Sequence, residues 1–180
     1  MSVMAPPAIR RALGAEVEEI EAVIGAANAG FEPIVPADFF RSYLASAMDV
    51  QGRMAVSTVL VADVGGRIVG TVTVFDDANE EGFPIAFPAG TAGLRATAVH
   101  PDAQGHGIGK ALVEACVDRA RRAGAARIGL HTAPFMTAAI SLYERTGFVR
   151  SPDHDFPATD FFPSAPRSDL VAMAFLRSLA

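Results

Sequence analysis

Hydrophobic and polar positions follow two different periods in the first half of this chain. Apolar residues recur at helical spacing over residues 14–30, a stretch that ends on Gly30, so this pattern predicts a helix. Residues 57–75 read "STVLVADVGGRIVGTVTVF", with a run rich in β-branched residues on each side of Gly65 and Gly66. Two such runs around a Gly-Gly pair are typical of a β-hairpin.

The rest of the chain alternates between strand and helix patterns, which together predict the fold class. We expect further strands at residues 8–13, 94–100, 126–132, 148–150 and 169–176, and further helices at residues 36–48, at 135–147 and between Gly109 and Gly124. Antiparallel patterns dominate the first half, and a strand-helix-strand unit occupies the second. The sequence therefore predicts an α/β fold, with a mixed, mostly antiparallel central sheet flanked by helices, in a single domain over residues 1–180.

Composition and charge narrow the class of protein. A chain of 180 residues with 51% hydrophobic and 19% charged residues has the makeup of a folded globular domain. A net charge of −5 without a run of Lys and Arg argues against nucleic acid as a partner. The single cysteine, Cys116, excludes an intrachain disulfide and a cysteine metal cluster. Neither a signal peptide nor a transmembrane span is expected, so we expect a cytoplasmic protein that does not insert into membranes.

The segment Gln104-Gly-His-Gly-Ile-Gly109 lies between a predicted strand and a predicted helix. In such a turn backbone N–H groups converge, the helix terminus adds about half a positive charge, and glycine leaves room for a close approach. The segment therefore predicts a site for phosphate. A P-loop would need Gly in place of Gln104 and Ser or Thr in place of Ala111. A dinucleotide loop would need Gly or Ala in place of Lys110, so the sequence disfavours both of these classes, including a kinase-like domain.

A third pattern, Gln/Arg-x-x-Gly-x-Gly/Ala, fits Gln104, Gly107 and Gly109. It resembles the acetyl-coenzyme A loop of the GCN5-related N-acetyltransferase (GNAT) family. Residues 138–150, "AAISLYERTGFVR", are similar to the next helix and strand of that family, where Ala-x-x-x-Tyr-x-x-x-Gly-Phe is typical. The resemblance covers residues 94–150, about a third of the chain.

The resemblance implies a cofactor and a set of residues that bind it. Acetyl-CoA would serve as co-substrate, with its pyrophosphate on the backbone amides of residues 104–110 and its pantetheine arm beside the preceding strand. No metal is implied, since amides and a helix terminus carry the phosphate charge. The cofactor-binding residues expected on this basis are Ala98, Val99, Gln104, Gly105, His106, Gly107, Ile108, Gly109, Lys110 and Tyr143.

The implied reaction is the direct attack of a primary amine on the acetyl thioester. At pH 7 only about one in a thousand molecules of an alkyl amine with a pKa near 10.4 is neutral, so deprotonation of the amine costs roughly 4–5 kcal/mol. The family resemblance makes the Val99 N–H the candidate donor to the oxyanion and Tyr143 the candidate donor to the leaving thiolate. A carboxylate base is common on the strand before the loop, but residues 94–99 contain none. His131, at the end of the neighbouring strand, is the candidate base, with a structural role as the alternative.

Other ionisable groups are expected to have ordinary roles. Acidic residues after the hairpin are expected to be solvated, although they lie near enough in sequence to reach a cleft, and a His-Asp pair in the late loop is a further candidate without support. Cys116 lies on the apolar face of its helix and is expected to be a buried, inert thiol. The acidic and His-Asp residues concerned are Asp76, Asp77, Glu80, Glu81, His154 and Asp155.

The sequence leaves the acceptor open. Residues 31–48, 81–93 and 151–167 are the variable parts expected to form its pocket, with Phe156, Phe161 and Phe162 as candidates for lining the acceptor pocket, for a dimer contact or for the core. A small-molecule amine and a peptide amine both fit, and so do a cationic acceptor and one that bears a carboxylate. A homodimer is possible. The alternative function is a non-catalytic, regulatory acyl-CoA-binding module, which the missing base keeps open.

Overall fold

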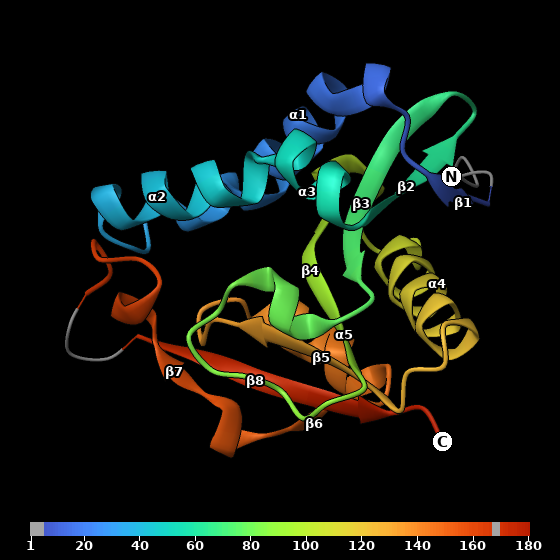
Figure 1. Ribbon diagram of the computed structural model, residues 1–180. Coiled ribbons are helices and arrows are strands. Elements are labelled where there is room, and N and C mark those ends of the chain that lie inside the picture. Colours follow the sequence, from blue (N-terminus) through green and yellow to red (C-terminus); the bar gives the residue numbers. More distant parts are fainter. Residues whose placement is uncertain (1–5, 167–169) are drawn as a thin grey trace.

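A central eight-stranded sheet organises the protein in the computed structural model, which describes residues 6–166 and 170–180. The strand order is β1–β2–β3–β4–β5–β8–β6, with β7 on β8, and only β4 and β5 run parallel. This arrangement confirms the predicted mixed, mostly antiparallel sheet (Figure 1). The strands are β1 (Ala8–Arg11), β2 (Thr58–Val64), β3 (Arg67–Phe75), β4 (Thr91–Val99), β5 (Arg127–Thr132), β6 (Val149–Arg150), β7 (Phe156–Pro157) and β8 (Val171–Ser178).

In the described part of the chain, five α-helices accompany the sheet. They are α1 (Val17–Asn28), α2 (Ala37–Met48), α3 (Val50–Val56), α4 (Ile108–Arg122) and α5 (Thr137–Arg145). Alternation along β2 explains the two layers: Val59 and Val61 pack with α1, whereas Leu60 and Ala62 join the larger core that contains α4. In Figure 1 α1, α2 and α3 lie together on one side of the molecule and α4 on the other.

Helix α3 is absent from the elements that the sequence predicts. The side chain of Asp49 caps it by accepting from the Gly52 N–H at 3.0 Å, and Val50 and Arg53 are buried beneath it. With a central glycine and only seven residues, the segment has a weak helical pattern of its own. Its helix is therefore fixed by the cap and by tertiary burial.

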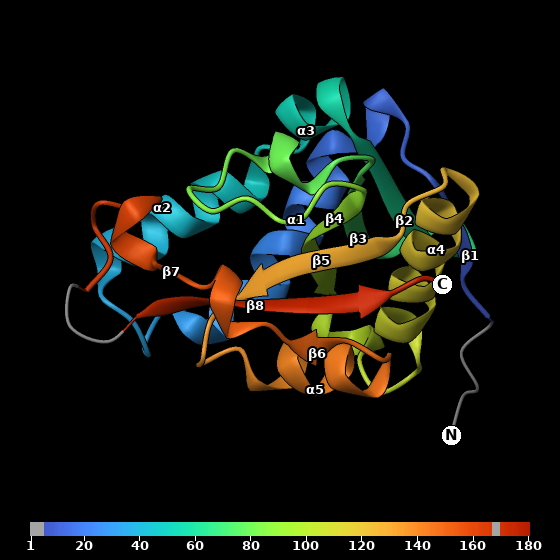
Figure 2. The same cartoon turned by 60° about the horizontal axis from the view of Figure 1, so that its bottom comes forward.

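Strands β4 and β5 separate after three residue pairs, which run from Thr91 opposite Arg127 to Gly93 opposite Gly129. Beyond Gly93 strand β4 continues with a bulge, in which the pairing with β3 shifts and Ala96 takes a positive φ of 54°. A bulge bends its strand and redirects the side chains around it. Beyond these three pairs β4 and β5 are not hydrogen-bonded to each other, although β5 still lies between β4 and β8, as Figure 2 shows.

Several predicted boundaries differ from the structure by a few residues. Strand β4 starts at Thr91, three residues earlier than expected, and the last strand starts at Val171, while the expected start at Asp169 lies outside the described residues. The expected loop 151–167 contains β7 and single turns of 3₁₀-helix, and its last residue also lies outside the described part.

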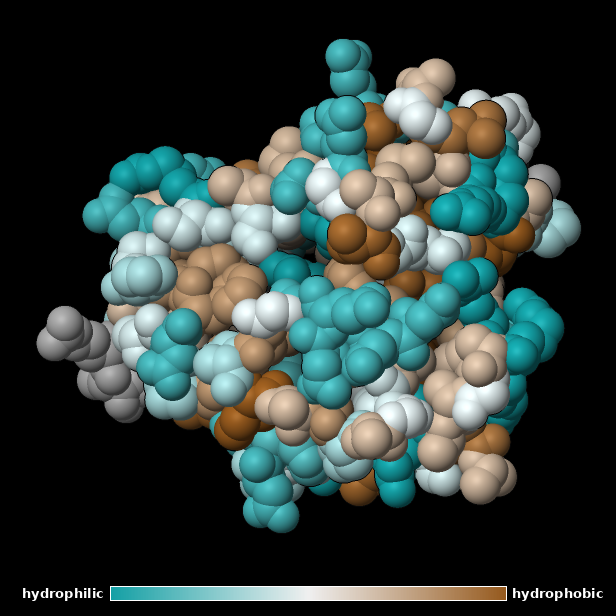
Figure 3. Space-filling view, viewed as in Figure 1, coloured by the Kyte–Doolittle hydropathy of each residue, from teal (hydrophilic) through white to brown (hydrophobic). Residues whose placement is uncertain are grey.

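Polar and apolar residues are interspersed on the face shown in Figure 3, where hydrophilic side chains gather over the connection between β3 and β4. No helix in the described part of the chain is long and apolar enough to cross a membrane. Within residues 6–166 and 170–180, no group of three or more His, Cys, Asp or Glu side chains is placed to hold a metal ion.

Candidate active site

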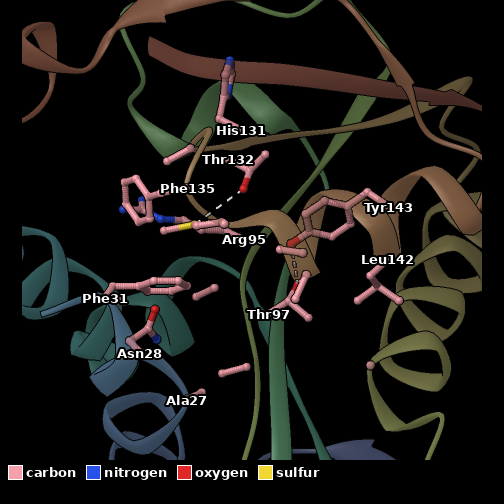
Figure 4. A pocket seen from close by; sticks show the side chains of 18 of the residues that line it. Ala27, Asn28, Phe31, Arg95, Thr97, His131, Thr132, Phe135, Leu142 and Tyr143 are labelled. Atoms are coloured by element: carbon pink, nitrogen blue, oxygen red, sulfur yellow. Dashed lines mark hydrogen bonds between the residues drawn. The ribbon is translucent and has the colours of Figure 1, made fainter. Parts of the chain in front are cut away.

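A cavity of about 660 Å³ fills the gap between the diverging strands. Residues 95–99 of β4 line it in one continuous stretch, although neighbouring residues of a regular strand face opposite sides of a sheet. The bulge at Ala96 explains this continuity. The cavity runs from the glycine loop and α5 at one end to α1 and α2 at the other (Figure 4).

The glycine loop has the backbone geometry expected of an anion site. Gly105 and Gly107 have φ values of 79° and 77°, which L side chains rarely adopt, and a Cβ at either position would meet open space. The first backbone hydrogen bond of α4 runs from the Ala111 N–H to the Gly107 carbonyl at 3.0 Å. Within the described residues, the N–H groups of residues 105–110 therefore have no acceptor in the protein, which leaves a row of donors at a helix N-terminus.

Side chains in and near the glycine loop stabilise its conformation. Gln104 Nε2 donates to the Val99 carbonyl at 3.2 Å, which ties the loop to the end of β4. His106 is exposed and its Nδ1 lies 2.9 Å from the Gln104 carbonyl. A Cβ at Gly109 would lie 3.1 Å from Leu142 Cδ2, so this glycine allows α5 to pack closely against α4.

Tyr143 faces the cavity from α5, where the sequence places it. Its side chain is buried, and its hydroxyl donates to Thr97 Oγ1 of β4 at 3.2 Å, as Figure 4 shows. Burial raises the pKa of Tyr143 to about 12, although the Thr97 hydrogen bond opposes the shift. The phenol is therefore neutral and can donate a hydrogen bond at any physiological pH.

His131 borders the cavity but its ring is turned away from it, as Figure 4 shows. Its Nε2 lies 2.9 Å from the His154 carbonyl, and the ring packs against Phe83, Phe87 and Phe156. Burial lowers the pKa of His131. Because a carbonyl only accepts, Nε2 carries the proton of the neutral ring. The structure thus places this predicted base in an aromatic cluster rather than opposite Tyr143.

The other candidate bases are also apart from the cavity. Asp155 pairs with Arg150 at 2.8 Å and accepts from the Ala174 N–H, and His154 Nδ1 lies 2.7 Å from Ser151 Oγ, so both have structural partners. The acidic residues Asp76, Asp77 and Glu80 are exposed, as expected. Cys116 is fully buried, and burial raises the pKa of its thiol, in agreement with an inert role.

Glu81 is the exception among the hairpin acids, and the expectation of a solvated charge is wrong for it. Only 7% of the residue is exposed, and neither carboxylate oxygen has a hydrogen-bond partner in the described structure. A Cβ at Gly93 would overlap this carboxylate, so the glycine makes the space that Glu81 occupies. Burial raises the pKa of Glu81 to about 8, against the opposing effect of Arg95. The sequence gives no sign of this burial, because it arises when residues 78–81 fold back onto β4.

The far half of the cavity is aromatic and is built from all three variable segments named above. Phe31 meets Phe135 edge to face at 5.2 Å, and Phe39 meets Phe162 at 5.7 Å. Asn28 accepts a hydrogen bond from the Tyr43 hydroxyl at 3.0 Å. The residues that line this half include Asn28, Phe31, Phe39, Tyr43, Phe83, Arg95, Phe135, Met136, Phe156, Ala158 and Phe162.

A row of unpaired amides that opens into a deep cavity is the arrangement expected for a long ligand with a phosphate at one end. A family model described as the acetyltransferase (GNAT) family matches residues 18–148. The chain therefore belongs to the GNAT family, as the glycine loop and the tyrosine helix predict.

Curated relatives match only part of this chain. A mycothiol acetyltransferase of Geodermatophilus obscurus is 44% identical over 52 residues, which cover 29% of this chain and 17% of that protein. A [ribosomal protein bS18]-alanine N-acetyltransferase of Escherichia coli K12 is 37% identical over 79 residues, 43% of this chain and 50% of that protein. The matched part thus spans half or less of the length of these relatives.

Among solved structures, a PaiA N-acetyltransferase from Thermoplasma acidophilum in complex with coenzyme A superposes with a TM-score of 0.72. The superposition covers 97% of this chain and 99% of that chain, with 12% sequence identity. At this identity the similarity concerns the fold alone.

Proposed function

We propose that the protein is an N-acetyltransferase that moves the acetyl group of acetyl-CoA to a primary amine by direct attack. The observation that carries the proposal is one cavity with unpaired backbone donors at one end and a buried phenol, Tyr143, on its wall. The mycothiol and ribosomal-protein acetyltransferases among its relatives both carry acetyltransferase activity in their names. Membership of the GNAT family supports the same chemistry.

In this proposal the amides of residues 105–110 hold the coenzyme A pyrophosphate. Lys110 and Arg145 also line the loop end of the cavity, so two cations add to the helix terminus there. Ala98 and Val99 lie along the cavity beside the pantetheine arm, with the Val99 N–H as the proposed donor to the oxyanion. The charge of the cofactor is met without a metal ion.

Tyr143 is proposed to stabilise the leaving thiolate. A thiol of ordinary pKa near 8.5 is a stronger acid than a phenol with a pKa of about 12, so complete proton transfer from Tyr143 is uphill. The phenol instead donates a hydrogen bond that strengthens as negative charge grows on sulfur. Thr97 Oγ1 accepts a hydrogen bond from the Tyr143 hydroxyl at 3.2 Å, and this contact holds the hydroxyl at the cavity wall.

The environment of the acceptor lowers the cost of deprotonating the amine. The cavity wall in the described structure contains no Asp or Glu, and its far half combines aromatic rings with the Arg95 guanidinium. Desolvation and a neighbouring positive charge both lower the pKa of an amine. We propose that the site selects the neutral amine and that the proton lost on attack leaves through water, while His131 supports the wall instead of serving as the base.

The experiment that tests this function compares binding with turnover. Saturating acetyl-CoA, at about a hundred times its Kd, is expected to stabilise the protein by about 2.7 kcal/mol, whereas ATP and NAD are expected to leave Tm unchanged. Amines are then expected to stimulate the release of free coenzyme A. Stabilisation without release from any amine would instead support the alternative, a non-catalytic acyl-CoA-binding module. A shift with ATP alone would contradict both.

A further inference from the structure

The charges that line the cavity are of one sign. The ionised side chains on its wall are Lys110 and Arg145 at the loop end and Arg95 at the aromatic end, and the described residues add no carboxylate. Phosphates of the cofactor account for the first two cations under the proposed function, on which this inference rests. Arg95 lies at the opposite end, beside Phe31 and Phe135 (Figure 4), and needs a different explanation.

Arg95 is held in place by contacts that leave its charge unneutralised. Its Nη2 donates to Ser46 Oγ of α2 at 2.7 Å, and its Cζ lies 5.0 Å from the Phe83 ring centre and 5.5 Å from that of Phe161. These contacts orient the guanidinium, but rings and a hydroxyl are not counterions. No ion pair of Arg95 occurs within residues 6–166 and 170–180.

The neighbouring ionisable groups do not supply the missing negative charge. Glu81 is sealed from solvent, forms no hydrogen bond and is mostly protonated at neutral pH, with a pKa raised to about 8. Asp49 caps the start of α3 and forms no ion pair with Arg95 among the described residues. Arg53 adds a second positive charge, and its own donors go to Thr73 Oγ1 and to two carbonyls of α2. Arg95 is half-buried, and a partly desolvated cation without an ion-pair partner is costly, so its position favours an anionic group of a ligand.

We propose that the acceptor is a small amine that also bears a carboxylate, and that Arg95 binds this carboxylate at the aromatic end of the cavity. A guanidinium presents paired N–H donors that match a carboxylate. The walls formed by Phe31, Phe39 and Phe162 suit an apolar or aromatic side group, so an apolar amino acid has the required chemistry. A cationic polyamine would instead place a second positive charge against Arg95.

The test compares matched acceptors that differ only in the carboxylate. The initial rate of coenzyme A release is measured with L-phenylalanine and phenethylamine, and with L-leucine and isoamylamine. We expect kcat/KM to be at least roughly tenfold higher for the carboxylate member of each pair, since one charge-assisted contact supports about a tenfold to hundredfold discrimination. Arg95→Gln is expected to remove this preference through KM, with less than about a threefold change for the decarboxylated amines.

Two further variants keep the comparison interpretable. Arg95→Lys retains the positive charge but lacks the paired N–H donors of the guanidinium, so it is expected to retain part of the preference for the carboxylate-bearing acceptor. It replaces Arg95→Gln in the comparison if Arg95→Gln does not fold. Arg122→Gln removes an exposed arginine of α4 outside the cavity and is expected to behave as the wild type. Equal or better rates with the decarboxylated amines would overturn the inference and leave the acetyltransferase proposal standing. No release with any amine, while acetyl-CoA still stabilises the protein, would overturn both.

Discussion

Three polar side chains, the buried Tyr143 and Glu81 and the half-buried Arg95, account for most of the chemistry proposed for this protein. Tyr143 was predictable, because its distance from Gly147 and Phe148 fits a helix typical of the family. Arg95 and Glu81 were not, since the surroundings of each depend on packing against another element: α2 for the first and β4 for the second. The periodicity of apolar residues identifies which face of a helix or strand is apolar, but it does not show which charged side chains become buried in the fold.

Replacement of Tyr143 by phenylalanine tests the proposed role of its hydroxyl. A lost hydrogen bond to a charged sulfur is expected to lower kcat by roughly tenfold to a hundredfold. The ring still fills the same space against Phe148, so the Kd for acetyl-CoA is expected to change less than about threefold. Steady-state kinetics and a binding titration on the same preparation check this. An unchanged kcat would remove the phenol from the mechanism.

Glu81→Gln tests whether the buried carboxyl is neutral. Its folded pKa of about 8 exceeds the ordinary value of 4.5, so the folded state holds this proton more tightly. Stability is therefore expected to fall as the pH rises from about 4.5 to about 8, by on the order of a few kcal/mol. Because glutamine cannot ionise, Glu81→Gln is expected to remove most of this pH-dependent loss of stability.

Thermal unfolding at pH 5, 7 and 9 gives the readout for Glu81→Gln. The variant is expected to match the wild type at pH 5 and to exceed its Tm at pH 9. If the substitution instead lowered Tm most strongly at pH 9, Glu81 would be an ionised partner of Arg95, and the unpaired charge on which the acceptor argument rests would not exist.

At the scale of elements, the glycine loop and the split between β4 and β5 create the site. The loop, the helix after it and the hairpin were predictable, because glycine spacing and residue period are local properties. The bulge at Ala96 and helix α3 were not, because β3 sets the first and the cap and burial of α3 set the second. The bulge lies where residues 95–99 line the cavity, and the sequence indicated the aromatic half only as three variable segments.

Gly107→Ala tests the loop, and Gly124→Ala at the other end of α4 is its matched control. Both glycines have φ near 80°, and a Cβ at either would meet no neighbour, so each substitution carries similar backbone strain of about 1 kcal/mol. Gly107→Ala also places a methyl group beside the unpaired amides. We expect the Kd for acetyl-CoA to rise at least roughly tenfold in Gly107→Ala and to stay unchanged in Gly124→Ala, by isothermal titration. Equal effects would show that the loop only stabilises the fold.

At the scale of the whole molecule, the fold brings unpaired backbone donors, a buried phenol and an unpaired guanidinium into one cavity from the glycine loop, α5 and β4. All three lie within residues 94–150, which resemble the family in sequence, whereas most of the remaining wall of the acceptor end is drawn from α1, α2 and the segments around Phe83 and Phe162. The segment that resembles the family therefore carries the proposed cofactor site, whereas much of the proposed acceptor site comes from segments outside it. Family membership alone leaves the second question open.

We propose that one cavity passes an acetyl group from coenzyme A to an amine. The most direct measurement is mass spectrometry of the acceptor after incubation of the full chain with acetyl-CoA that carries a deuterated acetyl group, with L-phenylalanine as the first acceptor and phenethylamine as the second. We expect to find the deuterated acetyl group on the amine nitrogen, in an amount proportional to the coenzyme A released. The amount of labelled product is expected to be much smaller with the Tyr143→Phe variant. Label found on neither acceptor while acetyl-CoA binds, or label released only as acetate, would contradict it.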